Sequence, residues 1–271
     1  MQKIKVAVLG ASGIGKYHAR EYKNAGCEVA AILGSTDNSS KRTAEMLKNQ
    51  FGISAKPYYN IDALLQNEKL DAVSICTPPK YHYGYVKKCL EAGLNVMCEK
   101  PFVLDNLTGN HNKALELINL ASSRKKIITT NTQWVSALRF IPQEIFSKTI
   151  SNFLIHMHPI GFRGIDLLTE CLPHLNSILI QLAGIGDMEN INFPIKSDNE
   201  VEVGFYYKTK SDGLCKASYH VKNKTEKPSD FGFSINGREF VRRIEDNYKQ
   251  HLLNNGKIYP IDDPLKLSFQ S

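Results

Sequence analysis

Short apolar runs alternate with helical patterns through the first half of the chain. Lys5 to Leu9, Glu28 to Leu33 and Ala72 to Cys76 are small-apolar or β-branched runs, as is typical of buried parallel strands. Helical patterns follow the first and third of these runs, over Lys16 to Ala25 and His82 to Ala92. Strands that alternate with helices in this way predict βαβ units and therefore a parallel sheet.

The second half of the chain has a different pattern. A helix is expected over Ile165 to Ala183, and after it Val201 to Tyr207 and Leu214 to Val221 alternate as antiparallel strands with one buried face do. Asn236-Gly237, flanked by Phe231 to Ile235 and Arg238 to Arg242, is the strongest short hairpin signal in the chain. These runs predict an α+β arrangement with a mainly antiparallel sheet.

A glycine-rich turn joins the first strand to the first helix. It reads Gly10-Ala11-Ser12-Gly13-Ile14-Gly15, a G-x-S-x-x-G pattern with Ser12 where a dinucleotide fingerprint normally has its second glycine. Such a turn lets the backbone approach a pyrophosphate, whose charge is stabilised by the helix N-terminus. A tight turn without a ligand is the alternative, but the position in the first βα unit favours dinucleotide binding.

The boundary between the two patterns is expected near residue 130. Ser122 to Lys126 is polar and basic, and the strand predicted after it, Ile127 to Thr130, closes the parallel sheet. We therefore expect an α/β protein with an N-terminal dinucleotide-binding Rossmann domain over residues 1–130. A C-terminal α+β domain for substrate binding or oligomerisation is expected over residues 131–271.

Three motifs of the first domain occur together in one known family. They are GASGIGKYH at 10–18, Thr77-Pro78 followed by His82, and Glu99-Lys100-Pro101. With them the sequence resembles the glucose–fructose oxidoreductase, inositol dehydrogenase and rhizopine-catabolism (Gfo/Idh/MocA) family, densely over residues 3–102 and more thinly beyond. The resemblance implies a nicotinamide-dependent dehydrogenase or reductase for a sugar, cyclitol or related carbonyl, hydroxyl or imine compound. A non-catalytic nucleotide-binding regulator on the same scaffold is the alternative, and the retained Lys100 favours the enzyme.

The expected cofactor contacts come from the glycine-rich turn, the end of the second strand and the family motifs. Together they are Gly10, Ser12, Gly13, Ile14, Gly15, Ser35, Thr36, Arg42, Thr77, Pro78, His82, Glu99 and Lys100. No carboxylate stands at the end of the second strand, where an Asp or Glu would bind the ribose 2′-hydroxyl of NAD. Ser35, Thr36 and Arg42 suit the 2′-phosphate of NADP instead, so NADP is preferred. Asp37 comes later in the sequence and could reach back to the ribose, so NAD remains the alternative cofactor.

The resemblance also implies a catalytic pair from the two domains. In the family, the lysine of the E-K-P motif acts with a histidine that follows an aspartate by four residues; here these positions are Lys100, His174 and Glu170. Pro173 complicates this expectation, because it would break or kink a helix that carries Glu170 and His174 on one face. Ser177 also departs from the family pattern, which leaves open whether the site oxidises alcohols. We assign proton transfer to His174 and orientation of the substrate to Lys100.

Substrate contacts are expected from Lys100, Trp134, Arg163 and His174. For two of them a structural role competes with the functional one. Trp134 is the only tryptophan and could pack in the core. His174 stands among apolar residues and could be a hydrogen-bonded core histidine.

Composition excludes several classes of protein. The net charge of +7 fits a solvated basic surface or attraction of an anionic cofactor and substrate, but no nucleic-acid motif is present. No apolar run approaches a membrane span, and no signal-peptide pattern opens the chain. Six cysteines without C-x-x-C spacing predict reduced thiols and no metal site, as in a cytoplasmic protein. The sheet of the second domain, if one face stays open, favours a homo-oligomer with a small-molecule substrate as the other partner.

Overall fold

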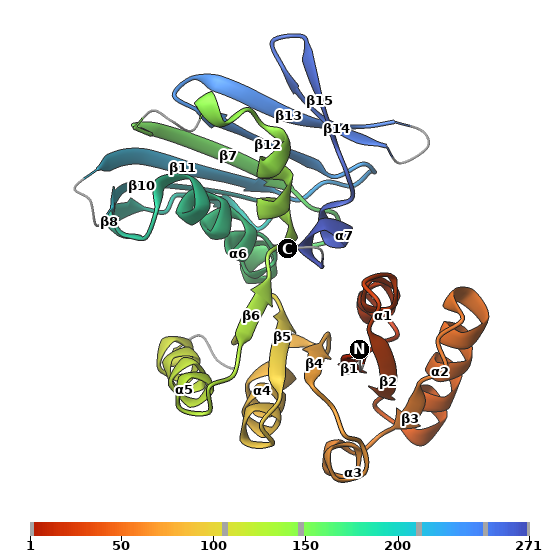
Figure 1. Ribbon diagram of the computed structural model, residues 1–271. Helices are drawn as coiled ribbons and strands as arrows, with labels where there is room; N and C mark the ends of the chain where they lie inside the picture. The colour runs from red at the N-terminus through yellow and green to blue at the C-terminus, as the bar shows by residue number, and fades with distance from the viewer. Residues whose placement is uncertain (1–2, 105–107, 146–148, 210–212, 246–248, 270–271) are drawn as a thin grey trace. The chain divides into compact units, whose positions relative to one another are not determined.

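A computed structural model describes residues 3–104, 108–145, 149–209, 213–245 and 249–269, with the backbone alone at 195–196. The chain forms two compact units, the first ending at Asn131 and the second beginning at Thr132. Each unit has its own sheet (Figure 1). Each also has its own buried hydrophobic residues.

The first unit is built on a six-stranded sheet in the order β3-β2-β1-β4-β5-β6, and every neighbouring pair is parallel. Its strands are β1 (Lys5–Leu9), β2 (Glu28–Leu33), β3 (Lys56–Tyr58), β4 (Ala72–Ile75), β5 (Asn95–Glu99) and β6 (Ile128–Asn131). The chain winds outward in one direction from β1 to β3 and in the other from β4 to β6. In a sheet of this kind the ligand crevice lies at the carboxyl ends of the strands where the direction changes, here β1 and β4.

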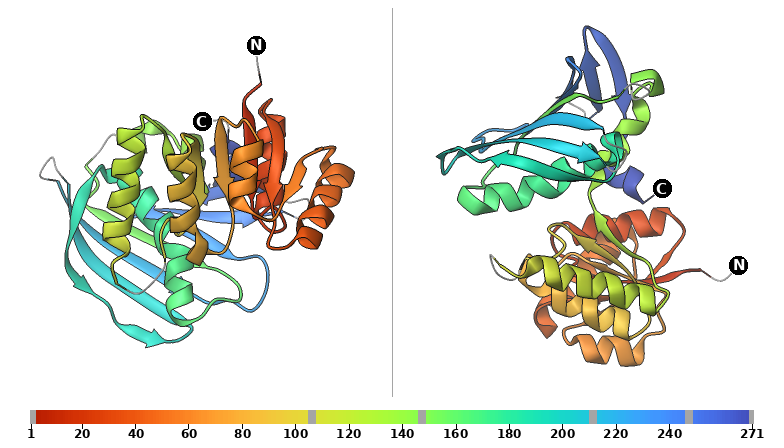
Figure 2. Two further views of the ribbon diagram at one scale, coloured as in Figure 1. Left: turned by 90° about the horizontal axis from the view of Figure 1, so that it is seen from below. Right: turned by 90° about the vertical axis from the view of Figure 1, so that its left-hand side faces the viewer.

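Helices cover both faces of this sheet (Figures 1 and 2). They are α1 (Gly15–Asn24), α2 (Asp37–Phe51), α3 (Ile61–Asn67), the short η1 (Pro79–Tyr81), α4 (His82–Glu91) and α5 (Asn110–Ser123). Val8 points to the face that Ala19 of α1 and Leu47 of α2 cover. Its neighbour Leu9 points to the other face, in a core that Leu90 of α4 shares. The alternation along β1 therefore builds two hydrophobic layers, and the predicted Rossmann fold is confirmed.

The second unit has a nine-stranded sheet in the order β15-β14-β13-β12-β7-β11-β10-β8, with β9 beside β10. Among the described strands of this sheet only β7 and β11 pair in parallel, so the mainly antiparallel sheet is also confirmed. Its strands are β7 (Asn152–His158), β8 (Gly186–Asn192), β9 (Ile195–Ser197), β10 (Glu200–Thr209), β11 (Leu214–Lys222), β12 (Asp230–Ile235), β13 (Arg238–Ile244), β14 (Gln250–Asn254) and β15 (Lys257–Ile261).

One face of this sheet is covered by the long helix α6 (Gly164–Ala183), as Figures 1 and 2 show. Phe153 and Ile155 of β7 point to that face and share a core with Leu175 and Ile178 of α6. The remaining helical segments are η2 (Gln133–Phe140), η3 (Gln143–Ile145) and α7 (Pro264–Ser268).

Two local expectations for the second unit can be compared with the structure. Asn236 (φ 49°) and Gly237 (φ 81°) both adopt positive φ between β12 and β13, as the predicted two-residue hairpin requires. Helix α6 continues through Pro173, so the proline neither begins nor ends it. Glu170 and His174 therefore lie one turn apart on a single helix.

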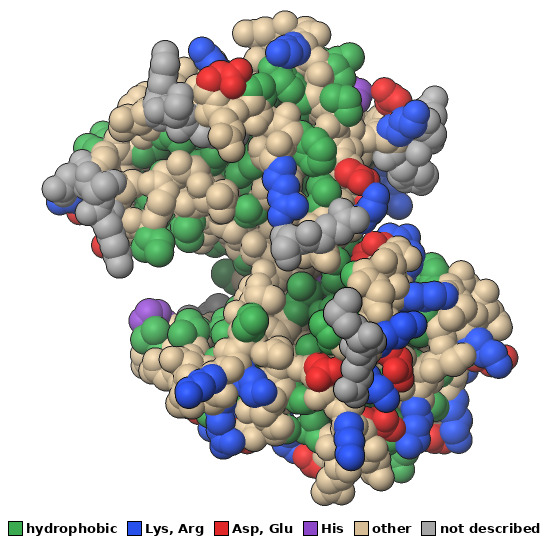
Figure 3. Space-filling view, in the orientation of Figure 1, with side chains coloured by type: hydrophobic (Ala, Val, Ile, Leu, Met, Phe, Trp, Pro, Cys, Tyr) green, Lys and Arg blue, Asp and Glu red, His purple; other side chains and the backbone are tan. Residues whose placement is uncertain are grey.

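Charged side chains of both signs lie on the surface, and the cysteines form no disulfide among the described residues. Lysine and arginine side chains are spread over the visible surface of the first unit, with carboxylates among them (Figure 3). The six cysteines are free thiols, four of them buried. In the part of the chain that the structure describes, no helix is long and apolar enough to cross a membrane. The same residues contain no group of three or more metal-ligating side chains placed to hold an ion.

Candidate cofactor pocket and catalytic edge

A pocket of about 490 Å³ lies at the carboxyl ends of β1, β2 and β4, where the winding direction changes. This volume lies in the range of small-molecule and cofactor sites, roughly 300–1,000 Å³. Its lining residues are Gly10, Ala11, Ser12, Leu33, Gly34, Ser35, Ser39, Thr43, Tyr59, Thr77, Pro78, Lys80, Tyr81 and Tyr85. Among the predicted cofactor residues, Gly10, Ser12, Ser35, Thr77 and Pro78 thus line one pocket.

Two glycines of the turn are required by close packing. Gly10 has φ +84°, and a Cβ there would lie 2.7 Å from the carbonyl oxygen of Cys76. A Cβ on Gly15 would lie 2.5 Å from the carbonyl oxygen of Gly10, so only glycine lets α1 begin this close to β1. Gly13 has no atom within 4 Å of its Cβ position, and Ile14 is the half-exposed residue before α1. Gly13, Ile14 and Gly15 do not line the pocket themselves.

The pocket has polar groups that suit a dinucleotide. Helix α1 begins directly after the glycine-rich turn, with no side-chain cap and no acidic residue in its first turn. Its N-terminus is therefore suited to an anion such as a pyrophosphate. The buried Thr77 Oγ1 has no hydrogen-bond partner within the described residues, which fits a hydroxyl that bonds a ligand.

The segment after β2 shows which predicted residues reach the pocket. Ser35 lines it, and its hydroxyl lies 3.3 Å from that of Ser39. Thr36 instead caps α2, accepting a 3.1 Å bond from the Ser39 N–H while the Ser39 hydroxyl accepts one of 2.9 Å from the Thr36 N–H. Arg42 is exposed and is not a lining residue. The Asp37 carboxylate accepts a 2.7 Å bond from Lys41 on the exposed side of the helix.

Sequence reasoning missed the wall that follows β4. Lys80 Nζ lies 5.0 Å from the centre of the Tyr81 ring, and Tyr81 stacks on Tyr85 at 6.0 Å between centroids. Tyr59 lines the pocket from the segment after β3. The available signal was position, because all these residues follow the carboxyl ends of parallel strands.

A buried polar network lies at the carboxyl end of β5. Glu99 Oε1 accepts a 2.8 Å bond from His18 Nε2 and a 2.6 Å bond from Asn131 Nδ2 at the end of β6. His18 Nδ1 lies 2.9 Å from the Ser74 hydroxyl of β4. Burial alone would raise the pKa of Glu99, but the hydrogen bonds and positive charge around it lower the pKa below its ordinary value. Glu99 is thus held as a carboxylate inside the first unit.

Lys100 follows Glu99 at the same edge of the sheet and is half-buried. Its backbone N–H donates a 3.3 Å bond to Glu99 Oε2. The buried His82 has Nε2 2.7 Å from the carbonyl oxygen of Thr77 and Nδ1 2.9 Å from that of Pro101. His82 therefore contacts main-chain carbonyls on either side of this edge.

The predicted residues of the second unit lie on two of its elements. On α6, His174 is buried at 5% exposure, Glu170 is half-buried one turn earlier, and Arg163 is exposed before the helix begins. Trp134 stacks on Phe231 with 4.4 Å between ring centres, and the Arg242 guanidinium lies 4.7 Å above its ring. Trp134 thus packs against the core, and its substrate contact stays a prediction. The pairing of Lys100 with His174 and Glu170 across the two units also stays a prediction.

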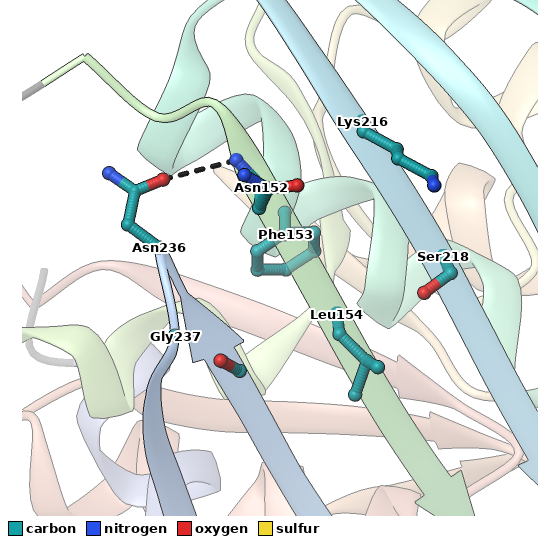
Figure 4. A pocket seen from close by; sticks show the side chains of 8 residues that line it. Asn152, Phe153, Leu154, Lys216, Ser218, Asn236 and Gly237 are labelled. Carbon is teal, nitrogen blue, oxygen red and sulfur yellow. Dashed lines mark hydrogen bonds between the residues drawn. The ribbon is translucent and has the colours of Figure 1, made fainter.

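A second pocket, of about 480 Å³, lies on the second unit's sheet at the start of β7 (Figure 4). Its wall includes Leu154, Lys216 and Ser218, which alternate with side chains buried beneath α6. Asn236 lies at its end, and its Oδ1 accepts a 3.0 Å bond from the Asn152 N–H. This pocket is on the sheet face away from α6. An open sheet face was the reason to expect a homo-oligomer, and the homo-oligomer stays a prediction.

Comparison with known proteins agrees with this geometry. Residues 4–132 match the Gfo/Idh/MocA family, described as an oxidoreductase family with an NAD-binding Rossmann fold. The chain is 29% identical over 128 residues to UDP-N-acetylglucosamine 3-dehydrogenase of Acidithiobacillus ferrooxidans, covering 47% of this chain and 36% of that protein. It is 33% identical over 119 residues to an NADP-dependent D-xylose 1-dehydrogenase of Hypocrea jecorina, covering 44% of this chain and 28% of that one. These matches span about a third of each relative's length.

The fold of the whole chain is also similar to a solved structure. A UDP-N-acetylglucosamine 3-dehydrogenase from Acidithiobacillus ferrooxidans superposes with a TM-score of 0.74 at 18% identity, over 100% of this chain and 87% of that one. At this identity the likeness concerns the fold alone. The motifs, the strand order and the family match together show that the N-terminal domain of this chain belongs to the Gfo/Idh/MocA oxidoreductase family.

Proposed function

We propose that the protein is a nicotinamide-dependent oxidoreductase that transfers hydride to or from a polyhydroxylated substrate such as a sugar, a cyclitol or a nucleotide sugar. The observation that carries this proposal is the placement of Lys100. It follows β5 at the same sheet edge as the pocket at the ends of β1 and β4, and its neighbour Glu99 is held in a buried network. A regulator that only binds a nucleotide has no use for a lysine there.

The pocket supports a dinucleotide as the cofactor. The uncapped start of α1 and the hydroxyls of Ser12 and Thr77 would hold the pyrophosphate, and the nicotinamide supplies the hydride acceptor or donor when it is bound. Lys100 would orient the reacting hydroxyl or carbonyl oxygen and stabilise negative charge that develops on it.

The second unit would supply the proton transfer. His174 is assigned as the general acid–base group, and Glu170, one turn earlier on α6, would orient it. Trp134 and Arg163 would contact the substrate. The relatives that match the first domain are named for oxidation of sugars and nucleotide sugars, and the net charge of +7 favours an anionic member of that class.

We further propose that NADP is preferred to NAD. No Asp or Glu is among the described residues that line the pocket, and Asp37 is paired with Lys41 outside it. The lining hydroxyl of Ser35 suits a 2′-phosphate. Lys80, which lines the pocket, replaces Arg42 as the cation assigned to that phosphate.

The proposal is tested with the full chain by two measurements. Titration of NADPH and NADH fluorescence measures cofactor binding, and absorbance at 340 nm measures turnover with monosaccharides, cyclitols, sugar phosphates and UDP-sugars in both directions. We expect saturable binding and turnover of at least one member of the panel. Saturable binding with no turnover of any member would contradict hydride transfer and favour the regulator.

A further inference from the structure

His18 belongs to helix α1, and its ring lies in the buried polar network at the carboxyl end of β5. It is fully buried, and its two nitrogens contact Ser74 and Glu99, which are 56 and 81 residues away in the sequence. A buried imidazole is costly unless its nitrogens are hydrogen-bonded, and here both have partners. An ionised carboxylate only accepts, so Nε2 carries the proton that is donated to Glu99.

The network continues from Glu99 to the main chain of Lys100. Oε1 of Glu99 is held by His18 and by Asn131, which leaves Oε2 to accept from the Lys100 N–H at 3.3 Å. The orientation of the Glu99 side chain therefore bears directly on where Lys100 leaves the strand. Without the His18 donor, one oxygen of a buried carboxylate would lose a strong bond and the carboxylate would reorient.

His82 holds the same segment from its other side. Its ring joins the carbonyl oxygen of Pro101, the residue after Lys100, to that of Thr77 in the pocket wall. Both neighbours are carbonyl oxygens, which only accept, so the ring holds Pro101 through the tautomer or the charged form that carries a proton on Nδ1. The ring is fully buried, which removes water as a competing partner.

We infer that His18 and His82 are positioning residues that hold the Glu99–Pro101 segment from both sides and so set the place of Lys100. This inference rests on the proposed function for its kinetic consequence, and on the structure alone for its mechanical one. Neither residue touches the reacting atoms. A misplaced catalytic group costs rate with little effect on cofactor affinity, because the affinity comes from the separate pocket at the ends of β1 and β4.

Four variants test the inference in the full chain. His18→Leu and His82→Leu remove the ring donors, His18→Gln keeps an N–H donor near the position of Nε2, and His111→Leu alters an exposed histidine on α5 as a matched control. Hydrogen exchange of residues 96–103, measured without cofactor, reports local opening of the segment. Steady-state kinetics with the substrate found in the panel report kcat and KM separately.

In His18→Leu and His82→Leu we expect exchange of this segment to be at least about fivefold faster, with α5 little changed. We expect kcat to fall roughly 10–100-fold with KM for the cofactor within about twofold, and His18→Gln to recover most of both effects. His111→Leu should match the parent. If His18→Leu does not fold, Ser74→Ala, which removes the partner of His18 Nδ1 and leaves the bond from Nε2 to Glu99 in place, is measured in the same two ways and should show smaller changes of the same sign.

Exchange that rises equally throughout the first unit would indicate a merely structural role and overturn the inference. Unchanged exchange of residues 96–103, or unchanged kcat with faster exchange, would also overturn it. If the parent turns over no substrate in the panel, the proposed function fails, and the exchange measurement still decides whether the two histidines hold the segment.

Discussion

The two units bring their candidate catalytic groups into place in different ways. At the carboxyl edge of the first sheet, α1, β4, β5 and β6 each supply one member of the His18–Ser74–Glu99–Asn131 network. In the second unit, Glu170 and His174 stand on one helix that packs against an apolar core. Strand order places the first group, whereas helical periodicity places the second.

This difference predicts how each region tolerates change. A residue in the network is bonded to others far along the chain, so its removal leaves buried polar groups without partners. A residue on α6 can be replaced while the helix keeps its packing through Leu175 and Ile178. Substitutions at the sheet edge should therefore affect the chemistry more strongly than substitutions on the helix.

The largest effect is expected for Lys100→Met. The substitution keeps the length of the side chain but removes its charge and its donors, so kcat should fall by roughly two to four orders of magnitude. Cofactor affinity should stay nearly unchanged. Steady-state kinetics and NADPH titration measure both quantities, and Lys69→Met, at an exposed lysine of the same unit, serves as the control. Turnover within a few-fold of the parent would rule out the assignment of Lys100.

A smaller loss is expected on α6. Loss of a general acid–base group typically costs about two orders of magnitude or more in kcat, so His174→Gln should lose about a hundredfold. Glu170→Gln keeps a hydrogen-bonding side chain and should lose no more than about tenfold, because Glu170 acts through His174. If both variants keep kcat within twofold, the proton transfer does not depend on α6. Candidate catalytic groups would then remain in the first unit alone.

The contrast between the units also appears in how much of the fold the sequence predicts. β1 and β2 have the predicted bounds, because buried parallel strands ended by glycine or proline give strong local signals. β8 was not predicted, since its side chains are mostly exposed and show no apolar alternation. β7 does alternate, with Phe153 and Ile155 buried, but this strand was not predicted.

Sequence patterns indicated the candidate-site residues that follow strand ends, whereas the contacts between distant segments were missed. Gly10, Ser12 and Thr77 were expected to contact a cofactor; they line one pocket, and their contact with a cofactor stays a prediction. Thr36 was expected to bind phosphate; its hydroxyl oxygen accepts the Ser39 N–H as the cap of α2, and its contact with a phosphate stays a prediction. The network around His18 joins four separate segments, and no local pattern reveals such a contact.

The cofactor preference distinguishes Lys80, which lines the pocket, from Arg42 on the neighbouring helix α2. If Ser35 and Lys80 hold a 2′-phosphate, NADP should bind about tenfold or more tightly than NAD, because a charge-assisted hydrogen bond contributes roughly 1.5–3 kcal/mol. Lys80→Ala should narrow this gap, and Arg42→Ala should leave it nearly unchanged, since Arg42 does not line the pocket. Dissociation constants for both cofactors measure the gap. Equal affinities in the parent would contradict the NADP preference.

The smallest expected effect is a difference in acid stability between the two units. Burial is the main cause that lowers the pKa values of His156 and His158 below the ordinary 6.5. The unfolded chain then binds protons more readily than the folded one, so the second unit should lose stability as pH falls below about 6.5. In the first unit the pKa of Glu99 is lowered, and its contribution is lost only below the ordinary carboxyl value of 4.5.

Trp134, the only tryptophan, lies in the second unit and reports its unfolding by fluorescence. Between pH 7 and pH 5.5 its transition should move down by a few degrees, since roughly 1 kcal/mol shifts the melting temperature by that amount. Hydrogen exchange of α5 at the same pH values follows the first unit and should change less. His158→Gln should flatten the pH dependence of the Trp134 transition, because one of the two groups that resist protonation is gone. A transition that is constant or rises as the pH falls would show that these histidines do not govern the stability of the second unit, and the two units would then respond to acid alike.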